Sequence, residues 1–232
     1  MSPQEKIMKL SVIMPVFNEE STILKIIDRV RKVDIDKQIV IVDDGSIDKT
    51  REILEKLSDE NIKVIYHAEN KGKGSAIRTA IPYLEGEVTV IQDADLEYDP
   101  EEYHKLVRPI MDGKASIVYG SRFLQFNKPI YLRYFLGNKF LTWLINILYC
   151  SRITDSYTCY KAFETGVLKN LTLRAKRFEF EAEVTVKLLK KGYEIREVPI
   201  SYSPRTLREG KKINWKDALL GILTILKYRL GK

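Results

Sequence analysis

The sequence predicts an α/β fold in which helices flank a mostly parallel sheet. Short apolar runs alternate with helical patterns through the first half of the chain, and 232 residues suit one large α/β domain. Strands that alternate with helices of this length form βαβ units with right-handed crossovers. We expect strands at 10–17, 38–42, 62–66, 88–91 and 116–119, and helices near 19–33, 48–58, 72–84 and 100–112.

Local signals support several of these boundaries. The second strand runs through Ile39-Val40-Ile41-Val42 into Asp43-Asp44-Gly45-Ser46, where Ser46 or Asp48 is placed to cap the next helix. Pro100 suits the first position of the helix that follows the fourth strand. The helices expected at 48–58 and 100–112 therefore begin at residue types that favour a helix start.

Beyond residue 120 the pattern changes. The segments 131–149 and 215–230 are long, apolar helical patterns with basic residues near their ends. Each is either a core helix or, together with the basic charge around it, part of a surface that rests on a membrane. Both readings stay open at this stage.

Charge is divided unevenly along the chain. Residues 1–120 carry 17 Lys and Arg against 23 Asp and Glu, and residues 121–232 carry 22 against 9, so the halves are −6 and +13. A basic half suits an anionic partner, which is a nucleic acid, an anionic lipid or a phosphorylated substrate. A nucleic acid would leave the acidic first half unexplained, so we expect none.

Cysteine content and hydropathy limit the cellular compartments in which we expect the protein. Two cysteines, Cys150 and Cys159, are too few and too weakly spaced for a disulfide framework or a metal knuckle. No run approaches the 18 or so apolar residues that a membrane span requires, and no secretory signal is visible. We expect a cytoplasmic protein, soluble or peripheral at the inner face of the cell membrane.

An acidic cluster follows the fourth expected strand. Asp93, Asp95 and Glu97 place three carboxylates within five residues, where they repel one another unless a cation or hydrogen bonds compensate. Mg²⁺ commonly takes one or two carboxylates together with phosphate oxygens. The cluster predicts a metal bound to a diphosphate, and its alternative is a solvated acidic turn.

Other polar residues also lie at the ends of expected strands. In open parallel sheets, ligands bind outside the carboxyl ends of the strands. We therefore expect one cleft to collect Asn18-Glu19, Asp43-Asp44 and Asp93-Ala94-Asp95.

A glycine-punctuated loop, Asn70-Lys71-Gly72-Lys73-Gly74, opens the third expected helix. It either brings backbone amides and Lys73 towards an anion or is a helix entry turn. The chain has no Walker A motif and no Gly-x-Gly-x-x-Gly after its first strand, which argues against a P-loop NTPase and a nicotinamide dehydrogenase.

Taken in order, these motifs resemble one family. The chain is similar to family 2 glycosyltransferases with the Rossmann-like GT-A fold, and most similar to the dolichyl-phosphate mannose synthase and polyprenyl-phosphate glycosyltransferase branch. The likeness spans roughly residues 9–215 and rests on Pro15-Val16-Phe17-Asn18-Glu19, Val42-Asp43-Asp44-Gly45-Ser46, Asn70-Lys71-Gly72-Lys73-Gly74, Asp93-Ala94-Asp95 and Gly120-Ser121-Arg122.

The resemblance implies roles for individual residues. Nucleotide-sugar contacts fall on Pro15, Asn18, Glu19, Asp43, Asp44, Lys73, Asp93 and Ala94. Metal ligands fall on Asp93, Asp95 and Glu97, the last standing where this branch often has Gln. Catalytic roles fall on Asp95, Asp155 and Arg122, and phosphate contacts on Arg122, Arg133, Arg205 and Lys211.

The resemblance also implies a reaction. The expected enzyme is an inverting, Mg²⁺- or Mn²⁺-dependent hexosyltransferase that uses a GDP-mannose or UDP-glucose type donor and a polyprenyl or dolichyl phosphate acceptor at a membrane surface. Residues 1–125 would bind the nucleotide-sugar, and residues 126–232, with amphipathic helices, would bind the acceptor within the same compact domain. The alternatives are transfer to a sugar hydroxyl with Asp155 as general base, and a noncatalytic nucleotide-sugar-binding module.

Overall fold

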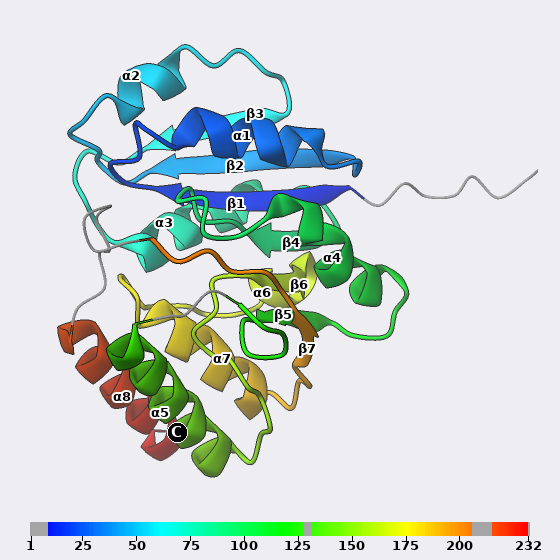
Figure 1. The fold of residues 1–232 in the computed structure, drawn as a ribbon, viewed down its shortest axis with the longest axis vertical. Helices are drawn as coiled ribbons and strands as arrows, with labels where there is room; N and C mark the ends of the chain where they lie inside the picture. The colour runs from blue at the N-terminus through cyan, green and yellow to red at the C-terminus, as the bar shows by residue number, and fades with distance from the viewer. Residues whose placement is uncertain (1–8, 128–130, 206–214, 232) are drawn as a thin grey trace, which may run out of the picture.

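A seven-stranded sheet organises the chain (Figure 1). The computed structural model describes residues 9–127, 131–205 and 215–231. The strands are β1 (Leu10–Val16), β2 (Lys37–Asp43), β3 (Ile62–Tyr66), β4 (Val88–Ile91), β5 (Ile117–Ser121), β6 (Lys161–Glu164) and β7 (Arg196–Pro199). Their order across the sheet is β3-β2-β1-β4-β6-β5-β7, and β6 is antiparallel to both of its neighbours.

Helices cover both faces of this sheet (Figure 1). They are α1 (Ile23–Lys32), α2 (Thr50–Glu55), α3 (Lys73–Ala80), α4 (Tyr103–Met111), α5 (Leu132–Tyr149), α6 (Thr165–Lys169), α7 (Phe180–Lys190) and α8 (Trp215–Leu230). Two 3₁₀ turns, η1 (Ile81–Tyr83) and η2 (Pro100–Glu102), extend α3 and precede α4. The predicted α/β class and mostly parallel sheet are confirmed.

The hydrophobic pattern explains the layers. In α1, Ile23, Ile26, Ile27 and Val30 recur at helical spacing and are buried against one face of the sheet, which α2 and α4 also cover. Residues of α3, α6 and α7 pack on the opposite face. The helices α5 and α8 pack outside α7 through a third apolar cluster, so they form an outer layer on that side.

The sheet contains two strands that the sequence did not predict. One of them, β6, lies between β4 and β5 and begins at Lys161, whose side chain is fully buried. A buried strand that starts and ends with charged residues does not show an apolar run. The other, β7, is a half-exposed edge strand beside β5.

Strand order fixes where a ligand can bind. The strand β1 is the point at which the strand order reverses, because β2 pairs with one edge of β1 and β4 pairs with the other. Such a switch point opens a crevice at the carboxyl ends of the strands. The register sets Val16 beside Asp43 and Ile13 beside Ile91, so the segments that follow β1, β2 and β4 meet at this crevice.

Gly45, two residues after β2, allows the chain to pass close to the loop at Glu69. Its φ is +72°, and a Cβ at this position would lie 2.5 Å from the backbone carbon of Glu69. Gly113 also has a positive φ of +67°, but nothing lies within 4 Å of the position of its Cβ. We expect Gly45→Ala to lower the free energy of unfolding by about 3 kcal/mol, because backbone strain and a steric clash add.

Chemical denaturation of both variants tests this expectation. Gly113→Ala carries only the strain of the left-handed conformation, so its loss should be about 1 kcal/mol. Equal losses in the two variants would contradict the close approach of Gly45 to the loop at Glu69.

Candidate active site

One cavity of about 740 Å³ lies at the carboxyl ends of β1, β2 and β4 and extends towards α5 and α8. The strand ends contribute acidic and small residues, and the second half of the chain contributes arginines and aromatic residues. The first group includes Pro15, Val16, Phe17, Glu19, Asp44, Asn70, Gly72, Lys73, Asp93, Ala94, Asp95 and Glu97. The second group includes Arg122, Arg133, Tyr134, Asn138, Leu141, Tyr157, Cys159, Arg177, Phe178, Glu181, Tyr202, Arg205 and Asp217.

Asp44 shapes the cavity wall next to the glycine-rich loop. Its carboxylate accepts hydrogen bonds from the backbone amides of Lys71 at 2.9 Å and Gly72 at 2.7 Å. The same carboxylate lies 2.6 Å from Nδ1 of His67. Asp44 therefore fixes the loop that carries Lys73, in addition to lining the cavity.

Two predicted nucleotide contacts have a supporting position instead. Asn18 and Asp43 are not among the described residues that line the cavity. The side chain of Asn18 accepts a hydrogen bond from the backbone amide of Ile47, and Asp43 is fully buried beside Arg51. Both residues hold the segment that follows β2 against the end of β1.

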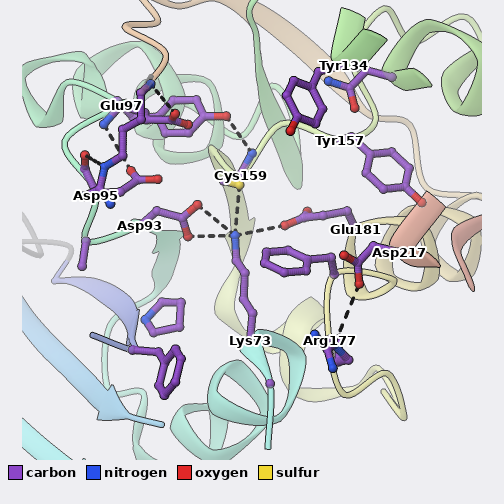
Figure 2. Close-up of a pocket in the computed structure, with 18 of the residues that line it drawn as sticks. Lys73, Asp93, Asp95, Glu97, Tyr134, Tyr157, Cys159, Arg177, Glu181 and Asp217 are labelled. Atoms are coloured by element: carbon purple, nitrogen blue, oxygen red, sulfur yellow. Dashed lines mark hydrogen bonds and ion pairs between the residues drawn. The ribbon is translucent and has the colours of Figure 1, made fainter. Parts of the chain in front are cut away.

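Lys73 lies at the centre of the site (Figure 2). Its ammonium is 2.7 Å from Asp93 and 3.0 Å from Sγ of Cys159. Burial lowers the pKa of a lysine, but nearby Asp93 and Glu181 outweigh burial, so the pKa of Lys73 lies well above its usual value. Burial likewise raises the pKa of a carboxyl, but Lys73 outweighs it at Asp93, whose pKa is lowered.

Asp95 has a different environment, although it is only two residues from Asp93. Burial, followed by the nearby charges of Asp93 and Glu97, raises the pKa of Asp95 to about 8. Its carboxylate accepts a 3.1 Å hydrogen bond from the backbone amide of Glu97. Full ionisation of this cluster is therefore unfavourable unless a further cation compensates its charge.

This donor set fits a divalent cation. Hard carboxylate oxygens of Asp95, with Asp93 and Glu97 beside it, are suitable ligands for Mg²⁺ or Mn²⁺. Among the described residues, no group of three or more acidic, histidine or cysteine side chains is placed to hold a metal ion without further ligands. An open arrangement with few protein ligands is typical of Mg²⁺ that also binds substrate phosphates.

Arg205 closes one side of the acidic cluster. Its guanidinium donates to both carboxylate oxygens of Glu19, at 3.1 and 2.6 Å, and to the carbonyl of Asp95 at 2.8 Å. Its backbone amide donates to Glu97 at 2.7 Å. Arg205, a predicted phosphate-binding residue, therefore lies at the site. It is paired there with Glu19, a predicted nucleotide contact.

Arg122 and Asp155 form a buried bidentate ion pair. The distances are 2.7 Å from Nε and 2.8 Å from Nη2 of Arg122 to the two carboxylate oxygens. Arg122 lines the cavity, whereas Asp155 has no exposed surface and is not among the described lining residues. In this conformation Asp155 positions Arg122, and neither of its oxygens is available to a substrate proton.

The two remaining phosphate candidates differ. Arg133, in the first turn of α5, lines the cavity and stacks on the ring of Tyr134 at 4.8 Å. Lys211 lies outside the described residues.

Three functional side chains were not predicted. Cys159, Glu181 and Tyr202 all line the cavity, and Tyr202 donates a 2.7 Å hydrogen bond to Glu97. Cys159 precedes the unpredicted β6, Tyr202 follows the unpredicted β7, and Glu181 belongs to α7, so each lies far in sequence from its partners. The sequence signal that includes Glu181 is the segment Phe178-Glu179-Phe180-Glu181, which resembles a motif of the same family.

Comparison with known proteins agrees with this architecture. The family model described as "Glycosyl transferase family 2" matches residues 11–171, which include β1 to β6 and the acidic cluster. The chain belongs to glycosyl transferase family 2.

Three archaeal relatives are similar to most of this chain. A "UDP-N-acetylglucosamine--dolichyl-phosphate N-acetylglucosaminyltransferase" of Methanococcus voltae is 33% identical over 87% of this chain and 89% of its own length. Agl6, a "low-salt glycan biosynthesis hexosyltransferase" of Haloferax volcanii, is 33% identical, and a "dolichol-phosphate mannosyltransferase" of Pyrococcus furiosus is 30% identical. These two matches cover 84% and 88% of this chain, but only 48% and 59% of the relatives' lengths.

Solved structures support the predicted GT-A fold. Glucosyl-3-phosphoglycerate synthase from Mycobacterium tuberculosis, crystallised with Mn²⁺, UDP and phosphoglyceric acid, superposes with a TM-score of 0.74. The match covers 96% of this chain and 78% of that one at 21% identity.

The raised pKa of Asp95 predicts a pH-dependent stability. The carboxyl binds its proton more tightly in the folded state, so the free energy of unfolding falls as pH rises from about 4 to about 8. Asp95→Asn removes this charge. Without metal, we expect the variant to exceed the wild type in free energy of unfolding by on the order of 2 kcal/mol at pH 9, and by much less at pH 4.

Urea unfolding in EDTA at both pH values measures this difference. Addition of Mn²⁺ at pH 8 should stabilise the wild type and leave Asp95→Asn nearly unchanged. A difference between the proteins that does not grow with pH would contradict the electrostatic environment described for Asp95.

Proposed function

We propose that the protein transfers a hexose from a nucleotide-sugar to a polyprenyl or dolichyl phosphate, with inversion at the transferred carbon. The observation that carries this proposal is that acidic strand ends, with Arg205 bound to them, line the same cavity as Arg122 and Arg133. The acidic end suits a metal-bound diphosphate, and the basic end suits a phosphate acceptor. The names of the Methanococcus and Pyrococcus relatives support the same acceptor class.

The acceptor's chemistry places modest demands on the protein. A phosphate monoester has a second pKa of about 6, so its oxygen is already an ionised nucleophile near neutral pH. The protein must instead align two phosphates that repel each other. In-line attack on the sugar carbon, opposite the leaving diphosphate, then gives the inverted product.

The chain's own residues can supply this alignment. A divalent cation at Asp95, with Asp93 and Glu97, would neutralise the charge that develops on the leaving diphosphate. Lys73 holds Asp93 in place, and Arg122 is held rigidly by Asp155 at the cavity wall. A bound diphosphate would compete with Glu19 for the guanidinium of Arg205, which is a good bidentate partner for phosphate.

The competing functions receive less support from the geometry. Transfer to a sugar hydroxyl needs a carboxylate within hydrogen-bond reach of that hydroxyl. Asp155 is buried with both oxygens bound to Arg122, so this site does not favour it as the base. A noncatalytic binding module leaves the arginines opposite the acidic cluster without a purpose.

A lipid acceptor also requires access from a membrane. On α5, Leu132, Leu136, Phe140, Trp143 and Ile147 form one exposed apolar row at helical spacing. On α8, Leu219, Leu220, Leu223, Leu226 and Leu230 are also exposed, and exposed Lys227 and Arg229 lie near its end. We infer that these rows, together called the α5/α8 apolar surface, rest on an anionic membrane.

This surface would lie on the membrane without crossing it. Among the helices within residues 9–127, 131–205 and 215–231, none has both the length and the apolar character of a membrane span. The first turn of α5 lines the cavity, so the same helix contributes to the site and to the apolar surface.

Released nucleoside diphosphate tests the reaction. Purified protein is incubated with Mg²⁺ or Mn²⁺, a panel of UDP- and GDP-sugars, and a short polyprenyl phosphate, in parallel with Asp95→Ala. We expect release that depends on the lipid and falls at least about 100-fold in the variant, because one metal ligand is lost. Release that ignores the lipid would favour a hydroxyl acceptor, and tight binding without turnover would favour a binding module.

Vesicle binding tests the α5/α8 apolar surface separately. Leu136→Asp and Ile147→Asp each place a charge where an apolar side chain would enter the lipid, so each should weaken binding about tenfold or more. The matched control is Ile47→Asp, because Ile47 is 88% exposed but lies after β2. Co-sedimentation with phosphatidylcholine vesicles that contain phosphatidylglycerol measures the effect, and equal losses in all three variants would contradict the assignment.

A further inference from the structure

Glu181, in the first turn of α7, lines the cavity and is held in place from behind. The ammonium of Lys161 donates to Oε2 of Glu181 and to the backbone carbonyls of Ser156 and Thr158. Lys161 is completely buried, so it cannot turn away to water. One carboxylate oxygen of Glu181 is therefore fixed, and the orientation of the other follows from it.

That second oxygen, Oε1, lacks a hydrogen bond. It is buried and has no hydrogen-bond partner in the part of the chain that the structure describes. Lys73 is 3.3 Å away, close enough for an ion pair but not placed to donate. Glu183, two residues later on α7, instead accepts hydrogen bonds from the backbone amides of Arg174 and Ala175. A carboxylate oxygen without a hydrogen-bond donor is therefore not a general property of this helix.

A buried acceptor without a hydrogen bond costs about 1–3 kcal/mol, and such a group calls for an explanation. The side chain of Glu181 is 4% exposed and lines the cavity beside Lys73 and Asp93 (Figure 2). A carboxylate oxygen repels an anionic group and accepts a hydrogen bond from a hydroxyl. The ligand group that fits Oε1 is therefore a neutral hydroxyl and not a phosphate.

The position of Oε1 indicates which molecule brings that hydroxyl. The ammonium of Lys73 contacts Asp93 on one side and Glu181 on the other, so Glu181 is separated from the acidic cluster by a single cation. If the donor diphosphate binds at that cluster, the sugar attached to it must lie next to Glu181. Lys73 then offers a hydrogen-bond donor beside the acceptor, which suits neighbouring hydroxyls of a hexose.

We propose that Oε1 of Glu181 accepts a hydrogen bond from one hydroxyl of the donor sugar and so selects donors that carry it. This inference rests on the proposed function, because it places a nucleotide-sugar in the cavity. A site built to pair with a hydroxyl rejects an analogue that lacks it, since the buried acceptor is then left unpaired. Glu181 thereby acts as a specificity residue.

Binding of deoxy donors tests the proposal. Calorimetry with Mn²⁺ measures the affinity of the UDP- or GDP-hexose that binds the wild type best, of analogues that each lack one hydroxyl, and of the nucleoside diphosphate alone. We expect one analogue to bind the wild type about 10- to 100-fold more weakly. Glu181→Gln should lose most of that discrimination, measured as the ratio between the affinities of the parent donor and the deoxy donor for the same variant, so that a change in nucleoside diphosphate affinity cancels.

Two further variants secure the interpretation. Glu181→Asp keeps the charge that pairs with Lys161, and it replaces Glu181→Gln if the latter does not fold. The matched control is Glu179→Gln, because Glu179 also has a buried oxygen without a hydrogen bond but is not among the described lining residues. The control should discriminate like the wild type.

The outcomes separate this inference from the proposed function. If the wild type binds every deoxy donor as tightly as the parent, or the Glu181 variants discriminate like the wild type, the role of Glu181 is overturned. Lipid-dependent turnover would still stand in that case. If no nucleotide-sugar binds the wild type, the proposed function and this inference fall together.

Discussion

The site depends on a buried row of alternating charges that runs from Asp93 through Lys73 and Glu181 to Lys161. Each charge is tolerable in the interior only because its neighbour has the opposite sign. The row joins the end of β4, the start of α3, the start of α7 and the start of β6. Elements that are far apart in sequence are therefore held in register by electrostatics at the point where a donor would bind.

The same row explains why Asp93 and Asp95 differ. Lys73 already pairs with Asp93, so the charge of Asp95 has no equally close cation. The guanidinium of Arg205 instead donates hydrogen bonds to Glu19 and to the backbone carbonyl of Asp95. Two carboxylates from one short motif thus have different environments, because Asp93 is paired with a lysine and Asp95 is not.

Much of the acidic end of the site was predictable, because local patterns determine it. Parallel strands such as β3 and β4 are short apolar runs, and the rule for strand carboxyl ends collected Glu19, Asp44 and Asp93 into one cleft. The part of the site that comes from the second half of the chain was less predictable, because its contacts join distant segments. No local pattern shows that Lys161 is buried in a strand or that Asp155 is occupied by Arg122.

The antiparallel strand β6 has a consequence for how the chain reaches its folded state. The strands β4 and β5 do not pair with each other, since each pairs with β6, which comes about 40 residues after β5 in the sequence. During synthesis, β1 to β4 can assemble while one edge of β4 stays open, and the remaining strands wait for 161–164 to emerge. Nascent chains that stop before that point would expose an apolar strand edge to other chains, which makes this interval the period when aggregation competes most strongly with folding.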